Sequence, residues 1–119
     1  MPVFIFSADA TRLQTAQVHT GYVADAKSLE EARNHLQRAA NCLVGPDSPD
    51  FQAAASDPCA GQGAIADSMD PHRVALAEEA LSQIKAGLGA PTLSGAQTAA
   101  KEATDTLRTA VTGPMIDNE

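Results

Sequence analysis

Four stretches of this chain carry a narrow apolar stripe that returns every three or four residues and consists largely of alanine. This spacing places the apolar side chains along one face of an α-helix. The chain holds 24 alanines, the residue with the highest helix propensity, but only three Phe, one Tyr and no Trp. Because the β-branched and aromatic residues that sheets favour are scarce, the pattern predicts an all-α fold. The expected helices span about residues 9–26, 28–44, 70–88 and 92–112.

Sequence signals mark the ends of these helices. Ser28 and Glu31 have the spacing of a capping box, in which the hydroxyl accepts from the Glu31 amide and the carboxylate reaches back. Asp70-Pro71 is typical of a helix start, since proline is tolerated at the first helical position. Gly45-Pro46 and Gly113-Pro114 are typical of helix ends, because glycine permits a left-handed cap and proline cannot continue the helix.

The four stripes can be buried if the helices pack against one another. Short turns near Lys27 and near residues 89–91 join the helices into two hairpins. We therefore predict a single domain over residues 1–119, folded as an antiparallel four-helix bundle. Residues 45–69, between the second and third helices, form a long loop with four Asp and no Lys or Arg. Loops of this length are usually functional or tied down.

The two cysteines of the chain predict a tether for this loop. Cys42 lies in the last turn of the second helix, and Cys59 lies 17 residues later in the loop. A disulfide that closes a ring of this size is expected to stabilise the fold by about 3 kcal/mol. It would place the protein in an oxidising compartment, so we expect a periplasmic or extracellular location. Two buried free thiols, or a redox or soft-metal pair, are the alternatives.

Charge and hydropathy argue against several classes of protein. The formal net charge is −7 and there is no basic cluster, so we expect no nucleic-acid binding. The apolar run at residues 3–6 is far too short to cross a bilayer, and we expect no membrane span. Residues 1–8 allow two interpretations, a remnant of an export signal or an apolar arm that docks on the bundle or on a second subunit.

His19 and His35 are the strongest candidates for ligand chemistry. Each lies eight residues from the turn near Lys27, so the two imidazoles are expected to be level across the first helical hairpin. Two facing imidazoles can bind a transition metal or the two sides of a haem iron. Glu78 on the third helix is the nearest candidate for a further metal ligand. The alternatives are a hydrogen-bonded structural pair and two unrelated surface histidines.

These features predict a protein that is not an enzyme. No serine or threonine forms a recognisable triad, and the Glu-x-x-His spacing of di-iron bundles is absent. We expect an exported binding or interaction module that works through the long loop or through the region around His19 and His35. A metal- or haem-binding protein in electron transfer or metal handling is the first alternative. A structural subunit completed as a homodimer, through stripe edges and the arm with Phe4 and Phe6, is the second.

Overall fold

The computed structural model describes residues 8–68 and 70–112, and in these ranges the chain is helical with no β-strand. The predicted all-α fold is therefore confirmed for this part of the chain. The long helices are α1 (Ala8–Tyr22), α2 (Leu29–Val44), α4 (Pro71–Leu88) and α5 (Leu93–Thr112), and the short ones are η1 (Val23–Asp25), η2 (Ala53–Ala55) and α3 (Ala64–Asp67). None of the described helices has the length and apolar character needed to cross a bilayer. The predicted helix stop at residues 113–114 and, except for Ala8, the N-terminal arm lie outside the described residues.

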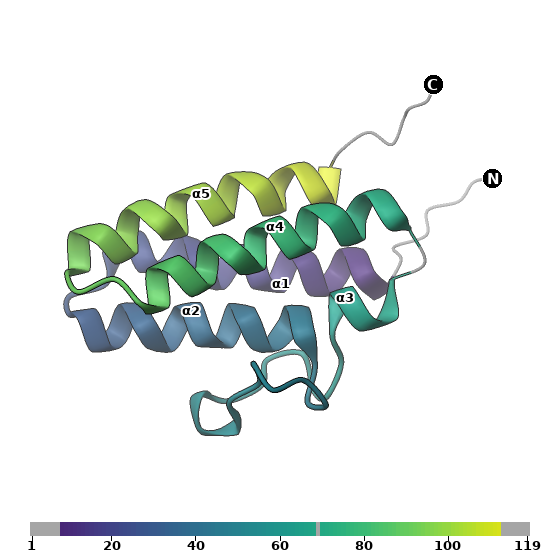
Figure 1. Ribbon diagram of the computed structural model, residues 1–119, viewed down its shortest axis with the longest axis horizontal. Coiled ribbons are helices and arrows are strands. Elements are labelled where there is room, and N and C mark those ends of the chain that lie inside the picture. Colours follow the sequence, from purple (N-terminus) through teal and green to yellow (C-terminus); the bar gives the residue numbers. More distant parts are fainter. Residues whose placement is uncertain (1–7, 69, 113–119) are drawn as a thin grey trace.

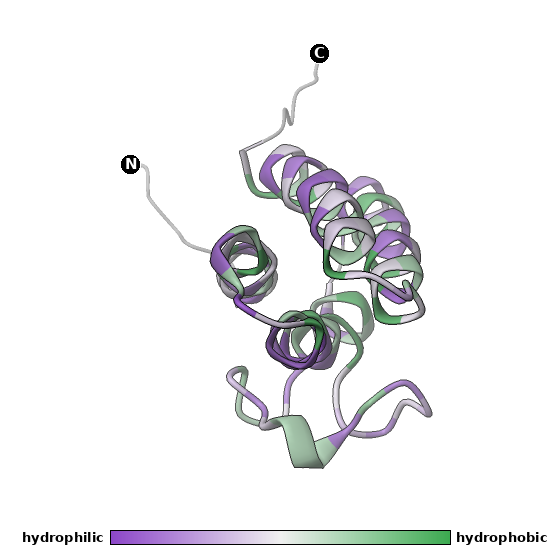
Figure 2. Cartoon of the chain, turned by 90° about the vertical axis from the view of Figure 1, so that its left-hand side faces the viewer, coloured by the Kyte–Doolittle hydropathy of each residue, from purple (hydrophilic) through white to green (hydrophobic). Residues whose placement is uncertain are grey.

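The four long helices lie side by side, and successive ones run in opposite directions (Figure 1). We call these four helices the helical body. α1 packs against α2 and α5, and α4 packs against the same two helices, so α1 and α4 occupy opposite corners. The view along the helices shows this arrangement (Figure 2). The short α3 contacts α1, α2 and α4 at one end of the body.

Alanine makes up most of the interior of the helical body. The largest apolar side chains that are fully buried are Leu13, Leu36, Leu43, Ile84 and Leu107. The buried alanines of the long helices are Ala16, Ala32, Ala39, Ala40, Ala77, Ala80, Ala96, Ala99, Ala100, Ala103 and Ala110. Because close packing of such small side chains requires the helices to approach one another, the core is thin.

Gly87 shows how closely α4 approaches its neighbours. A Cβ at this position would lie 2.9 Å from Cδ1 of Leu36 on α2 and 3.2 Å from Cβ of Ala99 on α5. Both distances are shorter than ordinary van der Waals contact. α4 continues through Gly87, and its C-cap is Gly89. Gly87 is therefore a packing residue.

α1 ends earlier than the predicted first helix. It stops at Tyr22, and Val23–Asp25 form a 3₁₀ turn in place of a helix that continues to Ala26. A 3₁₀ turn has about three residues per turn, so it changes the direction in which successive side chains point. Val23 stays buried, whereas the next residue, Ala24, is exposed.

The predicted caps at the starts of α2 and α4 are confirmed. Ser28 Oγ accepts a hydrogen bond from Glu31 N at 3.1 Å, and Glu31 Oε1 accepts one from Lys27 N at 2.9 Å. Asp70 Oδ1 accepts a hydrogen bond from His72 N at 3.0 Å. These bonds satisfy backbone N–H groups that have no partner inside the helix, and they fix where each helix begins.

Candidate functional site

Residues 45–63 lead from the end of α2 to α3 and project from the helical body (Figures 1 and 2). We call this segment the anchored loop. Apart from the three-residue η2 it is irregular, so most of its backbone groups cannot be satisfied by helical hydrogen bonds. Polar side chains from the end of α2 satisfy several of them.

Asn41, near the end of α2, is the centre of this anchoring. Its side chain is fully buried, and its Nδ2 donates to the carbonyl oxygens of Gln52 at 2.9 Å and Ser56 at 2.8 Å. Its Oδ1 accepts from Gln52 N at 3.0 Å and from Gln37 Nε2 at 3.1 Å. Both donor hydrogens and both acceptor positions of the amide are therefore used, which fixes the path of the loop.

Two further side chains of α2 and one of α4 also hold the loop. Gln37 Nε2 donates to Asp50 O at 2.9 Å, and Arg38 Nε donates to Ala55 O at 2.8 Å. From α4, Lys85 Nζ lies 3.1 Å from Asp50 Oδ2. The loop is therefore bound to two helices of the body.

Cys42 and Cys59 are brought together, as the sequence predicts. Cys42 is fully buried on α2, and Cys59 lies in the loop with its Cα 5.2 Å from that of Cys42. The two sulfur atoms are at disulfide distance. The separation of the Cα atoms falls within the range that disulfides require.

The two ends of the anchored loop meet at a pair of glycines. Gly45 has a φ of +78°, a conformation that glycine adopts readily. A Cβ on Gly63 would lie 2.5 Å from Gly45 N and from Val44 C, so this approach of two backbones requires glycine. The base of the loop is therefore closed by backbone contact in addition to the side-chain anchors.

Most of the aspartates that make the loop region acidic form hydrogen bonds or ion pairs within the chain. Asp57 accepts hydrogen bonds from two backbone N–H groups of its own turn. Asp67 pairs with Arg12 of α1 at 3.2 Å, and Asp50 pairs with the lysine of α4. Asp47 is exposed. Basic side chains of the helices therefore offset part of the negative charge of this region.

His19 of α1 and His35 of α2 face each other across the seam between their helices. Their Nδ1 atoms are 3.4 Å apart and their ring centroids are 5.6 Å apart. The distance between the ring centroids exceeds the distance between the two Nδ1 atoms by about 2.2 Å. This difference is close to twice the distance from the centre of an imidazole ring to one of its atoms. The Nδ1 atoms therefore lie near the line that joins the ring centres, and the rings meet edge to edge. In the neutral pair, one Nδ1 carries a hydrogen and the other accepts it.

Tyr22 lies against both rings of this histidine pair. Its ring centroid is 5.6 Å from that of His19 and 5.2 Å from that of His35. The two imidazoles are partly exposed, and Tyr22 is 50% exposed. An ion from solvent can therefore reach the pair.

The surroundings favour the neutral form of both imidazoles. Burial lowers the pKa of His19, and the positive charges of His35 and Arg38 lower it further. Burial and Arg38 also lower the pKa of His35, while the Glu31 carboxylate acts in the opposite direction. Arg38 is the side chain that donates to Ala55 O, so the histidine pair and the anchored loop share a positively charged neighbour.

Glu78, the third predicted metal ligand, does not join the histidine pair. It is exposed on α4, a helix that packs against α2 and α5. The prediction places Glu78 only by its level along the bundle, and α4 occupies the corner opposite α1. Within residues 8–68 and 70–112, no three His, Cys, Asp or Glu side chains are grouped so that they could hold a metal ion. A metal at His19 and His35 stays a prediction.

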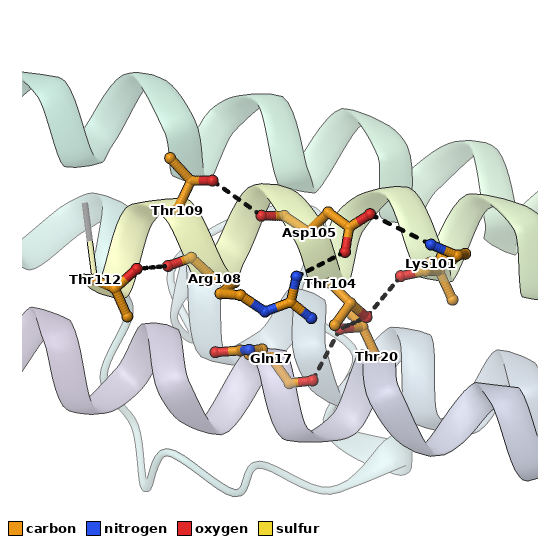
Figure 3. Close-up of polar contacts among 9 residues, drawn as sticks. Gln17, Thr20, Lys101, Thr104, Asp105, Arg108, Thr109 and Thr112 are labelled. Carbon is orange, nitrogen blue, oxygen red and sulfur yellow. Dashed lines mark hydrogen bonds and ion pairs between the residues drawn. The ribbon is translucent and has the colours of Figure 1, made fainter. Parts of the chain in front are cut away.

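A second polar region lies in a groove of about 540 Å³ between α1 and α5 (Figure 3). The hydroxyl of the buried Thr20 is 2.7 Å from that of Thr104. At the exposed rim, the Asp105 carboxylate binds Arg108 at 2.9 Å and Lys101 at 3.6 Å. The hydrogen bond from Arg108 and the charge of Lys101 lower the pKa of Asp105. Because two cations share a single carboxylate, the charged groups at the rim sum to one net positive charge.

Asn41 is the residue that anchors the loop, and the sequence patterns miss it. The signal that could have identified it is a side-chain amide inside the otherwise apolar run at residues 39–44. A buried polar side chain must find hydrogen-bond partners, so an amide at this place indicates a segment that packs over the helix end.

Comparisons with known proteins add no family assignment. No protein-family model, curated protein or solved structure matches this chain. Function must therefore be inferred from the residues that the fold brings together.

Proposed function

We propose that this protein is an exported, non-enzymatic binding module whose working surface is the anchored loop. Its scaffold is an antiparallel four-helix bundle, and a Cys42–Cys59 disulfide tethers the loop to it. The observation that carries the proposal is the fully used amide of the buried Asn41, which holds a projecting loop in one conformation.

The packing of the long helices supports the bundle as a scaffold. Successive helices alternate in direction, and each contacts at least two of the other three. A rigid group of helices can hold a loop at its end in a fixed position, and binding sites are most precise when rigid elements support them.

The loop is ordered although none of its residues 46–62 is fully buried. Fixing the backbone of one residue costs about 1–2 kcal/mol of conformational entropy. Gln37, Arg38 and Asn41 offset part of this cost through hydrogen bonds to five backbone groups of the loop. A loop that is fixed while most of its side chains stay outside the core is typical of a recognition surface.

The outer side of the loop indicates the kind of partner it fits. Its exposed residues include Pro46, Asp47, Pro49, Ala53, Ala54 and Pro58. This surface is small, apolar and acidic, without Lys or Arg. We expect a partner that places basic or hydrogen-bond donor groups near Asp47 and makes shallow apolar contacts with the alanines.

The cysteine pair supports export, because disulfides persist in oxidising compartments. Alkylation of the unfolded, unreduced protein, followed by mass spectrometry, tests the tether. We expect no alkylated cysteine. Two alkylated cysteines per chain would remove both the tether and the case for export.

A photo-reactive amino acid at Ala54 tests whether the loop is the working surface. In an extract of the native source, this variant should form a covalent adduct that excess unlabelled protein suppresses. The matched control carries the same group at Glu102, an exposed position on α5. Equal labelling from both positions, or no adduct from Ala54, contradicts the proposal.

An Asn41→Ala variant that also carries the photo-reactive group at Ala54 tests the role of the anchor. The outer surface of the loop is chemically unchanged, but its conformation is released. We expect a lower adduct yield with unchanged helix content. An unchanged yield would show that anchoring is not needed for binding.

A further inference from the structure

The histidine pair offers a second site, independent of the function proposed for the anchored loop. We propose that His19 and His35 hold one monovalent soft cation, Cu⁺ or its analogue Ag⁺, between their two Nδ1 atoms.

The direction of the nitrogen lone pairs is the first argument. An Nδ1 lone pair lies in the plane of its imidazole and points away from the ring centre. Because both Nδ1 atoms lie near the line between the ring centres, their lone pairs face each other across a gap of 3.4 Å. A cation in this gap is bound from opposite sides, in a linear arrangement.

The distance is the second argument. A bond from Zn²⁺ to imidazole is about 2.0–2.1 Å long, and a cation with bonds of similar length at the centre of a linear site requires Nδ1 atoms about 4 Å apart. Starting from 3.4 Å, the rings must separate by about 0.6 Å, which small rotations of two partly exposed side chains can provide. Tetrahedral Zn²⁺ would require lone pairs that converge at an angle and two more ligands. Cu²⁺ prefers four ligands in a tetragonal arrangement, whereas Cu⁺ and Ag⁺ accept two collinear nitrogens.

The charges around the pair are the third argument. The positive charge of Arg38 acts on both imidazoles and opposes added positive charge there, while the carboxylate of Glu31 partly compensates at His35. Two neutral imidazoles with a monovalent cation carry one positive charge, and with a divalent cation they carry two. Because repulsion by the guanidinium grows with that charge, the site favours the monovalent ion.

The surroundings admit a small ion better than a haem. Tyr22 lies against both imidazoles, and both imidazoles are partly exposed to solvent. A haem bound by both imidazoles would need a wide slot around the gap. α1 and α2 pack directly against each other along this seam, so no such slot is open.

Titration of the full-length protein with Cu⁺ under anaerobic conditions, against a chromophoric Cu⁺ chelator, tests the site. We expect one Cu⁺ per chain and a change in the fluorescence of Tyr22, the single tyrosine of a chain without tryptophan. His19→Gln and His35→Gln should each weaken Cu⁺ binding by more than about 100-fold, since even indirect partners of metal ligands contribute about 10–100-fold. His72→Gln, at an exposed position on α4, is the matched control and should bind like the unchanged protein.

Two further measurements separate this site from other ways of binding copper. X-ray absorption of the Cu⁺-loaded protein should show two nitrogen ligands and no sulfur. A Cys42→Ser/Cys59→Ser variant should keep the site, which excludes binding by reduced thiols. Circular dichroism checks that each variant retains its helices. The proposal is overturned by Cu⁺ binding that survives the histidine substitutions, by three or four ligands around copper, or by tighter binding of Zn²⁺ than of Cu⁺.

Discussion

The helical body and the anchored loop are both ordered, but contacts of different kinds order them. In the body, small apolar side chains from four helices bury one another, and Gly87 lets α4 approach two neighbours at once. In the loop, a few polar side chains hold a backbone segment whose residues 46–62 are never fully buried. The order of the body is therefore spread over many weak contacts, whereas that of the loop depends on a few specific ones.

This difference determines how far the effect of a substitution spreads. Loss of a core contact weakens every helix that shares the core, because small domains unfold cooperatively. Loss of a loop anchor should open the loop and leave the helices paired, since locally opened states need not involve global unfolding. Global unfolding of the helices and local opening of the loop can therefore be distinguished by experiment.

Leu36→Ala should have the largest effect. Leu36 is fully buried where α2 meets α4, and its removal leaves a cavity that the surrounding helices cannot fill. We expect the free energy of unfolding to fall by about 3–5 kcal/mol in chemical denaturation followed by circular dichroism. Leu81→Ala, at a partly exposed position on α4, is the control and should cost less. A Leu36→Ala variant in which only the loop opens, with the free energy of unfolding unchanged, would contradict the expected difference between core and loop substitutions.

Removal of the cysteine pair should come next. The double variant Cys42→Ser/Cys59→Ser should lose about 3 kcal/mol of stability, because the proposed disulfide can no longer restrict the unfolded chain. Hydrogen exchange should increase first at the amides of residues 46–62 and only later in the helices. Unchanged stability in the double variant would show that the pair does not constrain the chain.

Asn41→Ala should have a smaller and more local effect. The substitution leaves backbone groups of Gln52 and Ser56 without their partner, at a cost of about 1–3 kcal/mol. Limited proteolysis should cleave the loop faster while the helix content stays the same. Asn34→Ala, at an exposed position on the same helix, is the matched control and should change neither the rate of loop cleavage nor the helix content. Equal cleavage of the two variants would show that the amide is not the anchor.

Protonation of the histidine pair should have the smallest effect. The pKa values of His19 and His35 are lowered in the folded protein, so as the pH falls the unfolded chain takes up protons first. Their contribution to stability is therefore fully present above about pH 6.5 and is lost as the pH falls below it toward the lowered pKa values. A His19→Gln/His35→Gln variant should show a weaker decrease in stability between about pH 7 and pH 5 than the unchanged protein. Identical decreases would show that the pair does not contribute.

The helices could be predicted because their signals are local. The second predicted helix covers residues 28–44 and α2 spans Leu29–Val44, and the fourth covers 92–112 and α5 spans Leu93–Thr112. Stripe periodicity and caps depend on residues a few positions apart, so no knowledge of packing is needed. The first helix is the exception, because its predicted end at residue 26 overlooks the 3₁₀ turn.

The histidine pair was predictable because it depends on one hairpin. Counting from the turn near Lys27 places His19 and His35 opposite each other, and the structure brings them together. The same counting fails for Glu78, because it cannot tell which helices of four are neighbours. The role of Asn41 could not be found by periodicity, since its partners lie 11 and 15 residues away in a segment without a repeat.

The meeting of Gly45 and Gly63 has a practical consequence. Because these glycines bring the two backbones together where the loop leaves and rejoins the helices, the stretch between them is framed by fixed endpoints. Foreign peptides of similar length could replace the stretch between them, provided that the two glycines keep their contact. The molecule would then serve as a small display scaffold.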